Sequence, residues 1–336
     1  MNVLITGGSG YVGTRLTYYL LKRFNKIKIV NYDISLFGDE HLPENTNYFY
    51  EKKDIRDTNS FDNVLKKFNI DVVLHLACIS NDPTFELDSK ISKVINYECF
   101  ESLVKISKKN NVKKFIYAST SSVYGVSEDP NVTEEHPLKP ITDYNTYKGK
   151  CEPVLKKYLD DNFQGIIIRP ATVCGFSEKM RFDLSVNILT NHAYMNNKIS
   201  IFGGEQFRPN ININDMCRLY EFLIFNNIEK FNGEVFNAGL QNLKISEIAN
   251  IVKRVVEDRK KEKVELNFVH SDDIRSYRIT SDKIQNVLGF KFNFSIEDAV
   301  KELCDNFENG NLTDTLNSKY LNIQVLKEKI KKKEFI

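Results

Sequence analysis

The sequence predicts an α/β fold with a doubly wound parallel sheet and a smaller C-terminal lobe. Through the first half of the chain, short apolar runs alternate with longer amphipathic stretches, which is typical of a parallel sheet covered by helices on both faces. The length of 336 residues exceeds one average domain, and 41% of the residues are hydrophobic, enough for a sizeable core. A glycine-rich turn directly after the first apolar run is the third indication.

The expected elements follow from periodicity and turn residues. Five strands are expected in the first half, over Val3–Thr6, Ile27–Tyr32, Val72–Leu76, Lys114–Ala118 and Gly165–Arg169. Helical periodicity lies between them, near residues 11–24, 57–68, 89–110 and 143–162. The second half is less regular, with a strand at Ile199–Phe202 and helices near 183–196, 215–227, 245–257, 281–288 and 296–308.

No linker rich in Pro, Gly or Ser separates the two parts, so we expect them to be interwoven. The cofactor-binding domain is predicted to comprise residues 1–170 and about 211–240, and the substrate-binding lobe about 171–210 and 241–310. Residues 311–336 form a basic C-terminal tail, and we expect the stretch Lys327–Lys333 within it to be a solvated helix end or a frayed terminus.

Composition excludes several classes of function. A formal net charge of +2 gives no electrostatic footprint for nucleic acid. The six cysteines form no CxxC pair, so we expect reduced thiols and no metal site. No secretory leader and no apolar run near the roughly 18 residues of a membrane span are present, so we expect a soluble, cytoplasmic protein that does not bind membranes.

The turn after the first strand carries Gly7, Gly10 and Gly13, with a helical pattern immediately behind it. A side chain in this turn would hold a pyrophosphate away from the backbone N–H groups and the helix N-terminus. Asp33, at the end of the second strand, is placed to accept hydrogen bonds from the adenosine ribose and to repel a 2′-phosphate. These residues predict a Rossmann site for NAD, in preference to NADP.

Tyr144 and Lys148 lie four residues apart, on one face of a predicted helix. A neighbouring ammonium lowers a phenol's pKa, so Tyr144 is a candidate base for a hydroxyl proton. Thr120, beyond the carboxyl end of a parallel strand, is a candidate to hold the reacting oxygen. Taken alone, the Tyr-Lys spacing also fits a surface pair, and the hydroxyl cluster also fits a strand-end turn.

These motifs occur in the order and spacing of a known family. The chain resembles the extended short-chain dehydrogenase/reductases, specifically the nucleotide-sugar epimerase/dehydratase group. The resemblance covers about 300 residues and rests on ten segments: Gly7–Gly13, Asp33, Asp54-Ile55, Leu74–Ala77, Ser119–Gly125, Tyr144/Lys148, Arg169–Val173, Phe207–Asp215, Glu234–Gly239 and Asp273–Lys283.

The resemblance implies a role for each matching residue. Thr120, Tyr144 and Lys148 are the implied catalytic residues, and Thr120 also contacts the substrate. The implied cofactor site comprises Gly7, Gly10, Tyr11, Val12, Gly13, Asp33, Asp54, Ile55, Leu76, Ala77, Asn96, Ser119, Tyr144, Lys148, Pro170 and Val173. The implied substrate contacts are Asn81, Arg181, Asn187, Arg208 and Arg275, the last three holding the nucleotide diphosphate. The resemblance also implies a homodimer.

Departures from the family pattern narrow the reaction. The family's 4,6-dehydratases carry an Asp-Glu pair where this chain has Ser121-Ser122, so dehydration is not expected. What remains is NAD-dependent oxidation at C4 of a nucleotide-diphospho-sugar, most simply as a 4-epimerase. A net 4-dehydrogenase or 4-ketoreductase is the alternative within the class, and a catalytically silent NAD-sensing protein is the alternative outside it. The Ile79–Leu87 and Met180–Leu184 segments resemble a surface-polysaccharide and heptose-modifying branch.

Overall fold

The computed structural model describes residues 1–272 and 275–334. Its centre is a sheet of seven strands in the order β10-β6-β5-β4-β1-β2-β3, and every neighbouring pair is parallel. The strands are β1 (Asn2–Thr6), β2 (Lys28–Asp33), β3 (Tyr48–Lys52), β4 (Val72–His75), β5 (Lys114–Ala118), β6 (Gln164–Pro170) and β10 (Val235–Ala238). The doubly wound parallel sheet is therefore confirmed.

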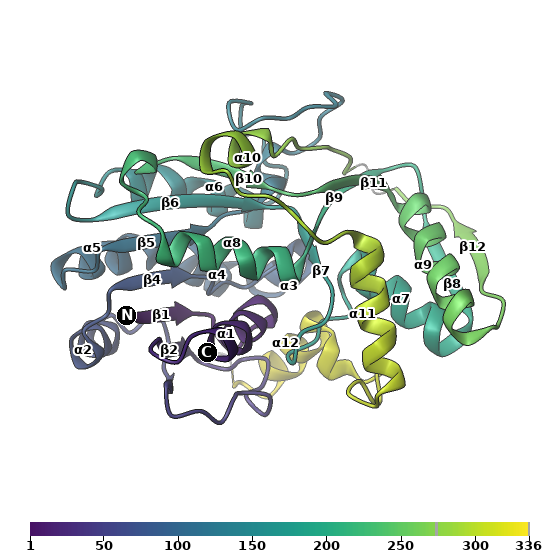
Figure 1. The fold of residues 1–336 in the computed structure, drawn as a ribbon, viewed down its shortest axis with the longest axis horizontal. Helices are drawn as coiled ribbons and strands as arrows, with labels where there is room; N and C mark the ends of the chain where they lie inside the picture. Colours follow the sequence, from purple (N-terminus) through teal and green to yellow (C-terminus); the bar gives the residue numbers. More distant parts are fainter. Residues whose placement is uncertain (273–274, 335–336) are drawn as a thin grey trace.

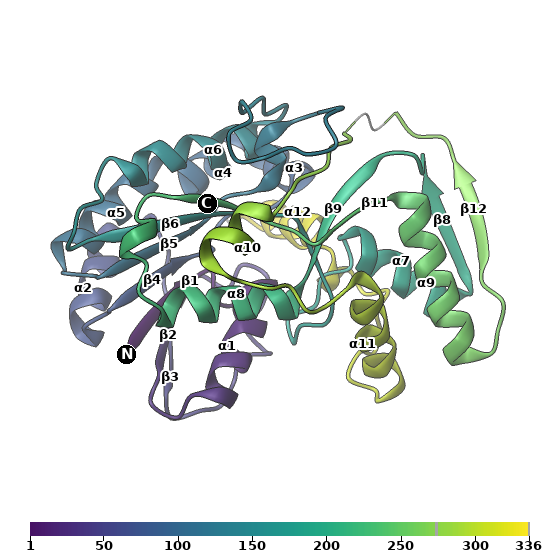
Figure 2. The ribbon, with the colours of Figure 1, turned by 45° about the horizontal axis from the view of Figure 1, so that its top comes forward.

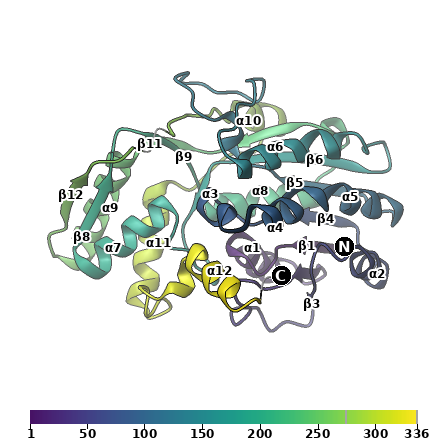
Figure 3. The same cartoon turned by 180° about the vertical axis from the view of Figure 1, so that it is seen from behind.

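Helices cover both faces of this sheet. On one face, α1 (Tyr11–Arg23), α8 (Ile213–Phe225) and α10 (Asp282–Leu288) pack on side chains such as Val3 and Ile5. On the other, α2 (Thr58–Phe68), α5 (Phe100–Lys109) and α6 (Asp143–Lys156) pack on residues that include Leu4. Side chains of β1 thus alternate between two cores, as a strand buried on both sides requires. Figure 1 shows the face of the sheet that α8 covers, and Figure 3 shows the opposite face, with α5 in front.

The C-terminal lobe has its own hydrophobic core. It is built from α7 (Ser185–Asn196), β8 (Lys198–Phe202), α9 (Ile245–Lys260), β12 (Glu265–Val269) and α11 (Ile296–Glu308). A three-stranded sheet of β7 (Thr172–Cys174), β9 (Phe207–Asn212) and β11 (Gln241–Lys244) joins it to the main sheet. Figure 2 shows this lobe gathered to one side of the parallel sheet.

The expected elements were largely found, with differences of physical origin. The predicted helix at 89–110 is interrupted: α4 (Ser89–Lys93) continues into a π-helical turn, η2 (Val94–Glu98), before α5. Upstream of it lie α3 (Asp82–Phe85) and the single turn η1 (Glu86–Asp88). Strand β3 was missed because its residues are half-buried at the sheet edge and lack apolar alternation.

The basic stretch Lys327–Lys333 is the solvated end of a helix, as expected, and Lys327 and the lysines at 331–333 are exposed. The first part of the tail, by contrast, is packed against the rest of the chain. A turn, η5 (Ser318–Tyr320), leads into α12 (Asn322–Lys331), whose Leu326 is fully buried. Residues 335–336 of the tail, and Asp273 at the start of the last resembling segment, lie outside the described residues.

Within the described ranges, no helix is long and apolar enough to cross a membrane. The same part of the chain contains no cluster of potential metal ligands. All six cysteines are free thiols, and Cys78 alone among them is partly exposed.

Candidate active site

The glycine turn shapes the floor of a groove at the carboxyl ends of β1, β2 and β4. Gly7 has a φ of +74°, and a Cβ there would stand 2.6 Å from the backbone nitrogen of Ala77. A Cβ at Gly13 would stand 2.6 Å from the carbonyl oxygen of Gly7. Gly10 precedes α1 without a side-chain cap, so the first N–H groups of this helix remain available to an anion. This cradle fits a pyrophosphate.

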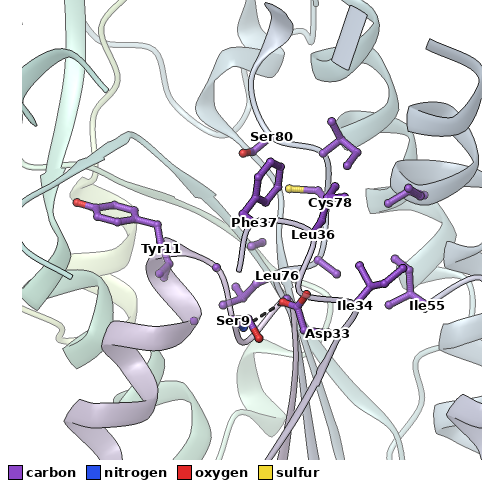
Figure 4. A pocket seen from close by; sticks show the side chains of 18 of the residues that line it. Ser9, Tyr11, Asp33, Ile34, Leu36, Phe37, Ile55, Leu76, Cys78 and Ser80 are labelled. Atoms are coloured by element: carbon purple, nitrogen blue, oxygen red, sulfur yellow. Dashed lines mark hydrogen bonds between the residues drawn. The ribbon is translucent and has the colours of Figure 1, made fainter. Parts of the chain in front are cut away.

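Asp33 stands beside this turn (Figure 4). Its carboxylate accepts hydrogen bonds from the backbone N–H groups of Ser9, at 3.0 Å, and Ser35, at 2.7 Å. Burial raises the pKa of this carboxyl, and the two N–H groups oppose the shift. The acidic group is therefore fixed at the end of β2, where an adenosine ribose would lie.

The groove brings together every residue that the sequence predicted for the cofactor except Asn96. Asp54 and Ile55 line one end of it, and Asp54 is also paired with Arg56 at 2.6 Å. Pro170 and Val173 line the other end, with Leu76, Ala77 and Ser119 between. The residues present thus fit an extended dinucleotide.

Asn96 was expected at the cofactor but lies behind the groove. Its amide oxygen accepts from the N–H of Ile79 at 2.8 Å, and its amide nitrogen donates to the Ile79 carbonyl at 3.0 Å. The side chain is 3% exposed, so it fixes the groove wall and does not contact what the groove holds.

A second, wider cleft opens between the sheet and the C-terminal lobe. It is lined by Asn81, Thr120, Arg181, Arg208 and Arg275, five of the six predicted substrate contacts. The two cavities share a wall formed by Tyr144 with Tyr11, Val12, Ser80, Ser119, Pro170, Val173 and Arg181. A molecule in each cavity would therefore meet at Tyr144.

Tyr144 and Thr120 meet at this junction from different elements. Tyr144 projects from α6, and Thr120 follows β5. The Thr120 hydroxyl lies 2.6 Å from that of Ser122, and it accepts a hydrogen bond from the Ser122 N–H.

Burial raises the pKa of Tyr144 well above its usual value, the Cys78 thiol and the Asp82 carboxylate raise it further, and Arg181 opposes the shift. The sequence assigned this opposing role to Lys148. In the structure the Lys148 ammonium donates to the Ala118 carbonyl and stands 4.7 Å from the Tyr117 ring centre. Among the charges that shift the pKa of Tyr144 most, the cation is therefore Arg181, to which the resemblance assigned only a substrate contact.

Arg181 is held rigidly. Its guanidinium pairs with Asp183 at 2.9 and 3.0 Å and donates to the Ser80 hydroxyl at 3.0 Å. Asn81 donates to the same Asp183 carboxylate at 3.1 Å. Such a bidentate pair keeps the buried guanidinium charged and its plane fixed.

Asn187 was expected at the nucleotide diphosphate, but it does not reach the cleft. The side chain is fully buried; its oxygen accepts from the N–H of Gly175 at 3.0 Å. Its nitrogen donates to the Tyr11 hydroxyl at 3.2 Å and the Arg181 carbonyl at 3.0 Å. Asn187 thus braces two residues of the shared wall from behind.

Arg208 and Arg275 lie together at the outer part of the cleft. Arg208 donates to the Arg275 carbonyl, and the Arg275 guanidinium pairs with Asp82 at 2.8 Å. Asp82 and Tyr277 line the cleft without having been predicted. Asp82 lies in the segment Ile79–Leu87, which departs from the family pattern, and Tyr277 lies in the resembling segment Asp273–Lys283, but neither residue was singled out. The Tyr277 hydroxyl lies 3.1 Å from that of Ser121.

The model of the NAD dependent epimerase/dehydratase family matches residues 3–239. The chain belongs to this family. It is accordingly an NAD-dependent enzyme of the nucleotide-sugar epimerase, dehydratase and dehydrogenase group, and the alternative of a catalytically silent NAD-sensing protein is not supported.

Individual family members show how far the likeness extends. A dTDP-D-glucose 4,6-dehydratase of Dictyostelium discoideum is 28% identical over 276 residues, which is 76% of this chain but 61% of that protein. A GDP-6-deoxy-D-talose 4-dehydrogenase of Aggregatibacter actinomycetemcomitans is 27% identical over 90% of this chain and 96% of its own length. The solved structure of a UDP-glucose 4-epimerase with UDP-glucose from Thermotoga maritima shares the fold, with a TM-score of 0.78, 23% identity, and coverage of 92% of this chain and 99% of that one.

Proposed function

We propose that this enzyme is a nucleotide-sugar 4-epimerase, which oxidises C4 of the sugar and re-reduces the ketone on its other face. The observation that carries the proposal is the shared wall at Tyr144, where the cofactor groove and the wide cleft meet. A sugar carbon in the cleft would there lie against the nicotinamide end of the groove. NAD supplies the hydride acceptor, and the side chains of this chain supply the proton transfers.

Tyr144 is the proposed base for the C4 hydroxyl proton. Because burial raises the pKa of Tyr144, its phenolate form needs a nearby positive charge. Arg181 lies in the same shared wall and supplies such a charge. Lys148 lies one helical turn from Tyr144, on the groove side. Thr120 is proposed to hold the reacting oxygen through its hydroxyl, which Ser122 already orients.

The polar groups near Thr120 favour oxidation over dehydration. Water elimination requires a carboxylic acid and a carboxylate at the sugar, whereas Ser121 and Ser122 offer hydroxyls that are engaged with Tyr277 and Thr120. Asp82 is a carboxylate of the cleft, but it is engaged by the Thr142 hydroxyl at 2.6 Å and by Arg275.

The substrate is proposed to be a nucleotide-diphospho-sugar. Arg208 and Arg275 bring two guanidinium groups to one edge of the cleft, and such groups recognise phosphate oxygens with two parallel hydrogen bonds. A homodimer remains our prediction from the resemblance, as does the surface-polysaccharide and heptose-modifying branch. A cytoplasmic location remains our prediction from the composition of the chain.

A net 4-dehydrogenase is the second candidate, favoured by the nearly full-length likeness to the talose 4-dehydrogenase. A panel of UDP-, GDP- and dTDP-hexoses separates the two when products are resolved by chromatography and NADH is followed by absorbance. We expect a C4 epimer and no accumulation of NADH in solution. A 4-keto product formed with one equivalent of free NADH would establish the dehydrogenase instead.

A further inference from the structure

The C-terminal helix α12 forms part of the cofactor groove. Asn322, its first residue, lines the groove and is 4% exposed. Figure 3 shows α12, in yellow, running from the lobe back toward the half of the molecule that carries the parallel sheet. Nothing in the sequence had assigned this segment a role at the cofactor.

Leu326 anchors the helix across the groove. It is fully buried in a cluster with Leu36, Ile79 and Phe85. Leu36 follows β2 and Ile79 follows β4, and both residues also line the groove. One buried cluster therefore joins Leu326 of α12 to residues from both walls of the groove.

The chain leading into α12 is tied to the lobe. The N–H of Phe182 donates to the Tyr320 carbonyl at 3.0 Å, and the two rings pack edge to face with centroids 5.2 Å apart. The amide of Asn191 donates to the Thr315 carbonyl at 3.2 Å. The segment is thus fixed at the lobe before it crosses to the groove.

We propose that α12 retains the dinucleotide: Asn322 contacts bound NAD, and Leu326 must leave its cluster before NAD exchanges with solution. The consequence for catalysis rests on the proposed epimerase, because a cofactor held throughout the cycle returns the hydride to the sugar that supplied it. Retention of NAD by α12 does not depend on which reaction the enzyme catalyses.

The test compares the full-length enzyme with Leu326→Ala and with the matched control Leu316→Ala. Leu316 precedes α12 and is 66% exposed, so its truncation leaves the cluster intact. Each protein is loaded with NADH and chased with excess NAD, without any sugar, and release is followed by NADH fluorescence. Hydrogen exchange at the amides of residues 322–331 reports the opening of α12.

We expect Leu326→Ala to release NADH about tenfold faster or more, since removing a buried leucine weakens docking, and to exchange its α12 amides faster. Leu316→Ala should match the wild type in both. Faster amide exchange with an unchanged release rate would overturn the role of the helix.

A second variant keeps the helix docked and tests the contact itself. We expect Asn322→Ala to release NADH several-fold faster while its α12 amides stay protected. Release at the wild-type rate would overturn the contact assigned to Asn322, and it would do so even if Leu326→Ala were to fold poorly. A wild-type enzyme that holds NADH but yields a 4-keto sugar would overturn the epimerase and leave retention by α12 standing.

Discussion

The cofactor groove and the substrate cleft meet at Tyr144 but are built by different means. The groove is shaped mainly by backbone: a glycine turn, an uncapped helix and two N–H groups that fix Asp33. The cleft is shaped by side chains from the ends of β5 and β6, from α6, from residues 181–189 and from the lobe. These backbone features all lie within the first 35 residues, whereas side-chain recognition in the cleft requires segments that are far apart in the sequence and meet only in the folded chain.

The sharpest way to separate the two regions is Tyr144→Phe, which removes the hydroxyl and keeps the ring. We expect kcat to fall about a thousandfold, since a positioned acid-base group contributes roughly 10²–10⁴. NAD content should stay at the wild-type level, because the groove keeps its shape. Steady-state kinetics together with the NAD content of the purified protein measure both, and near-normal kcat would remove Tyr144 from the mechanism.

Gly13→Ala attacks the groove instead. The new Cβ would stand 2.6 Å from the Gly7 carbonyl oxygen and from the Gly8 Cα, so the backbone of the turn must shift. We expect NAD affinity, measured by calorimetry, to fall about a hundredfold. Gly310→Ala is the control, because no atom lies within 4 Å of its Cβ, although its φ of +72° adds modest backbone strain. Equal NAD affinity in both variants would contradict the role of the turn.

Arg208→Ala tests the outer part of the cleft. Loss of a charge-assisted contact to phosphate corresponds to about 1.5–3 kcal/mol, so we expect KM for the nucleotide-sugar to rise roughly ten- to a hundredfold. Asn187→Ala is the informative comparison, because this buried amide braces Tyr11 and Arg181. It should lower the melting temperature, while Arg208→Ala should not. A rise in KM confined to Asn187→Ala would contradict Arg208 as a diphosphate contact and would support the contact predicted for Asn187.

The buried His75, at the end of β4, gives a prediction for the pH dependence of stability. It is buried beside Thr6, with ring nitrogen and hydroxyl 2.8 Å apart, and burial, aided by the positive charge of Lys148, lowers its pKa to about 3. Between about pH 6.5 and 3 the His75 ring is protonated in the unfolded chain but neutral in the folded chain. The free energy of unfolding therefore decreases as the pH is lowered through this range. We expect a slope of about 1.4 kcal/mol per pH unit from this group.

Denaturant unfolding at several pH values measures this slope, and His75→Asn supplies the comparison. Because the variant lacks the titrating ring, its stability should fall less steeply between pH 6.5 and 4. Identical slopes in the two proteins would contradict a neutral, buried His75.

What could be read from sequence follows the same division. The glycine turn, Asp33 and the pairing of Tyr144 with Lys148 depend on local spacing, and the structure brings all of them to one groove. Asn96 and Asn187 match family positions, but burial decides which way their amides face, and no spacing reveals that. Leu326 was not predicted to be buried, because nothing in its local sequence shows the cluster with Leu36 and Ile79 that it joins in the folded chain.

The central claim is that one NAD molecule removes and returns the same hydride at C4. The most direct measurement uses a nucleotide-sugar labelled with deuterium at C4, mixed with unlabelled NAD and NADH in solution and analysed by mass spectrometry after conversion. We expect the C4 epimer to keep its deuterium and the NADH in solution to stay unlabelled. Deuterium appearing in free NADH, together with a 4-keto sugar, would contradict the epimerase and establish a net dehydrogenase.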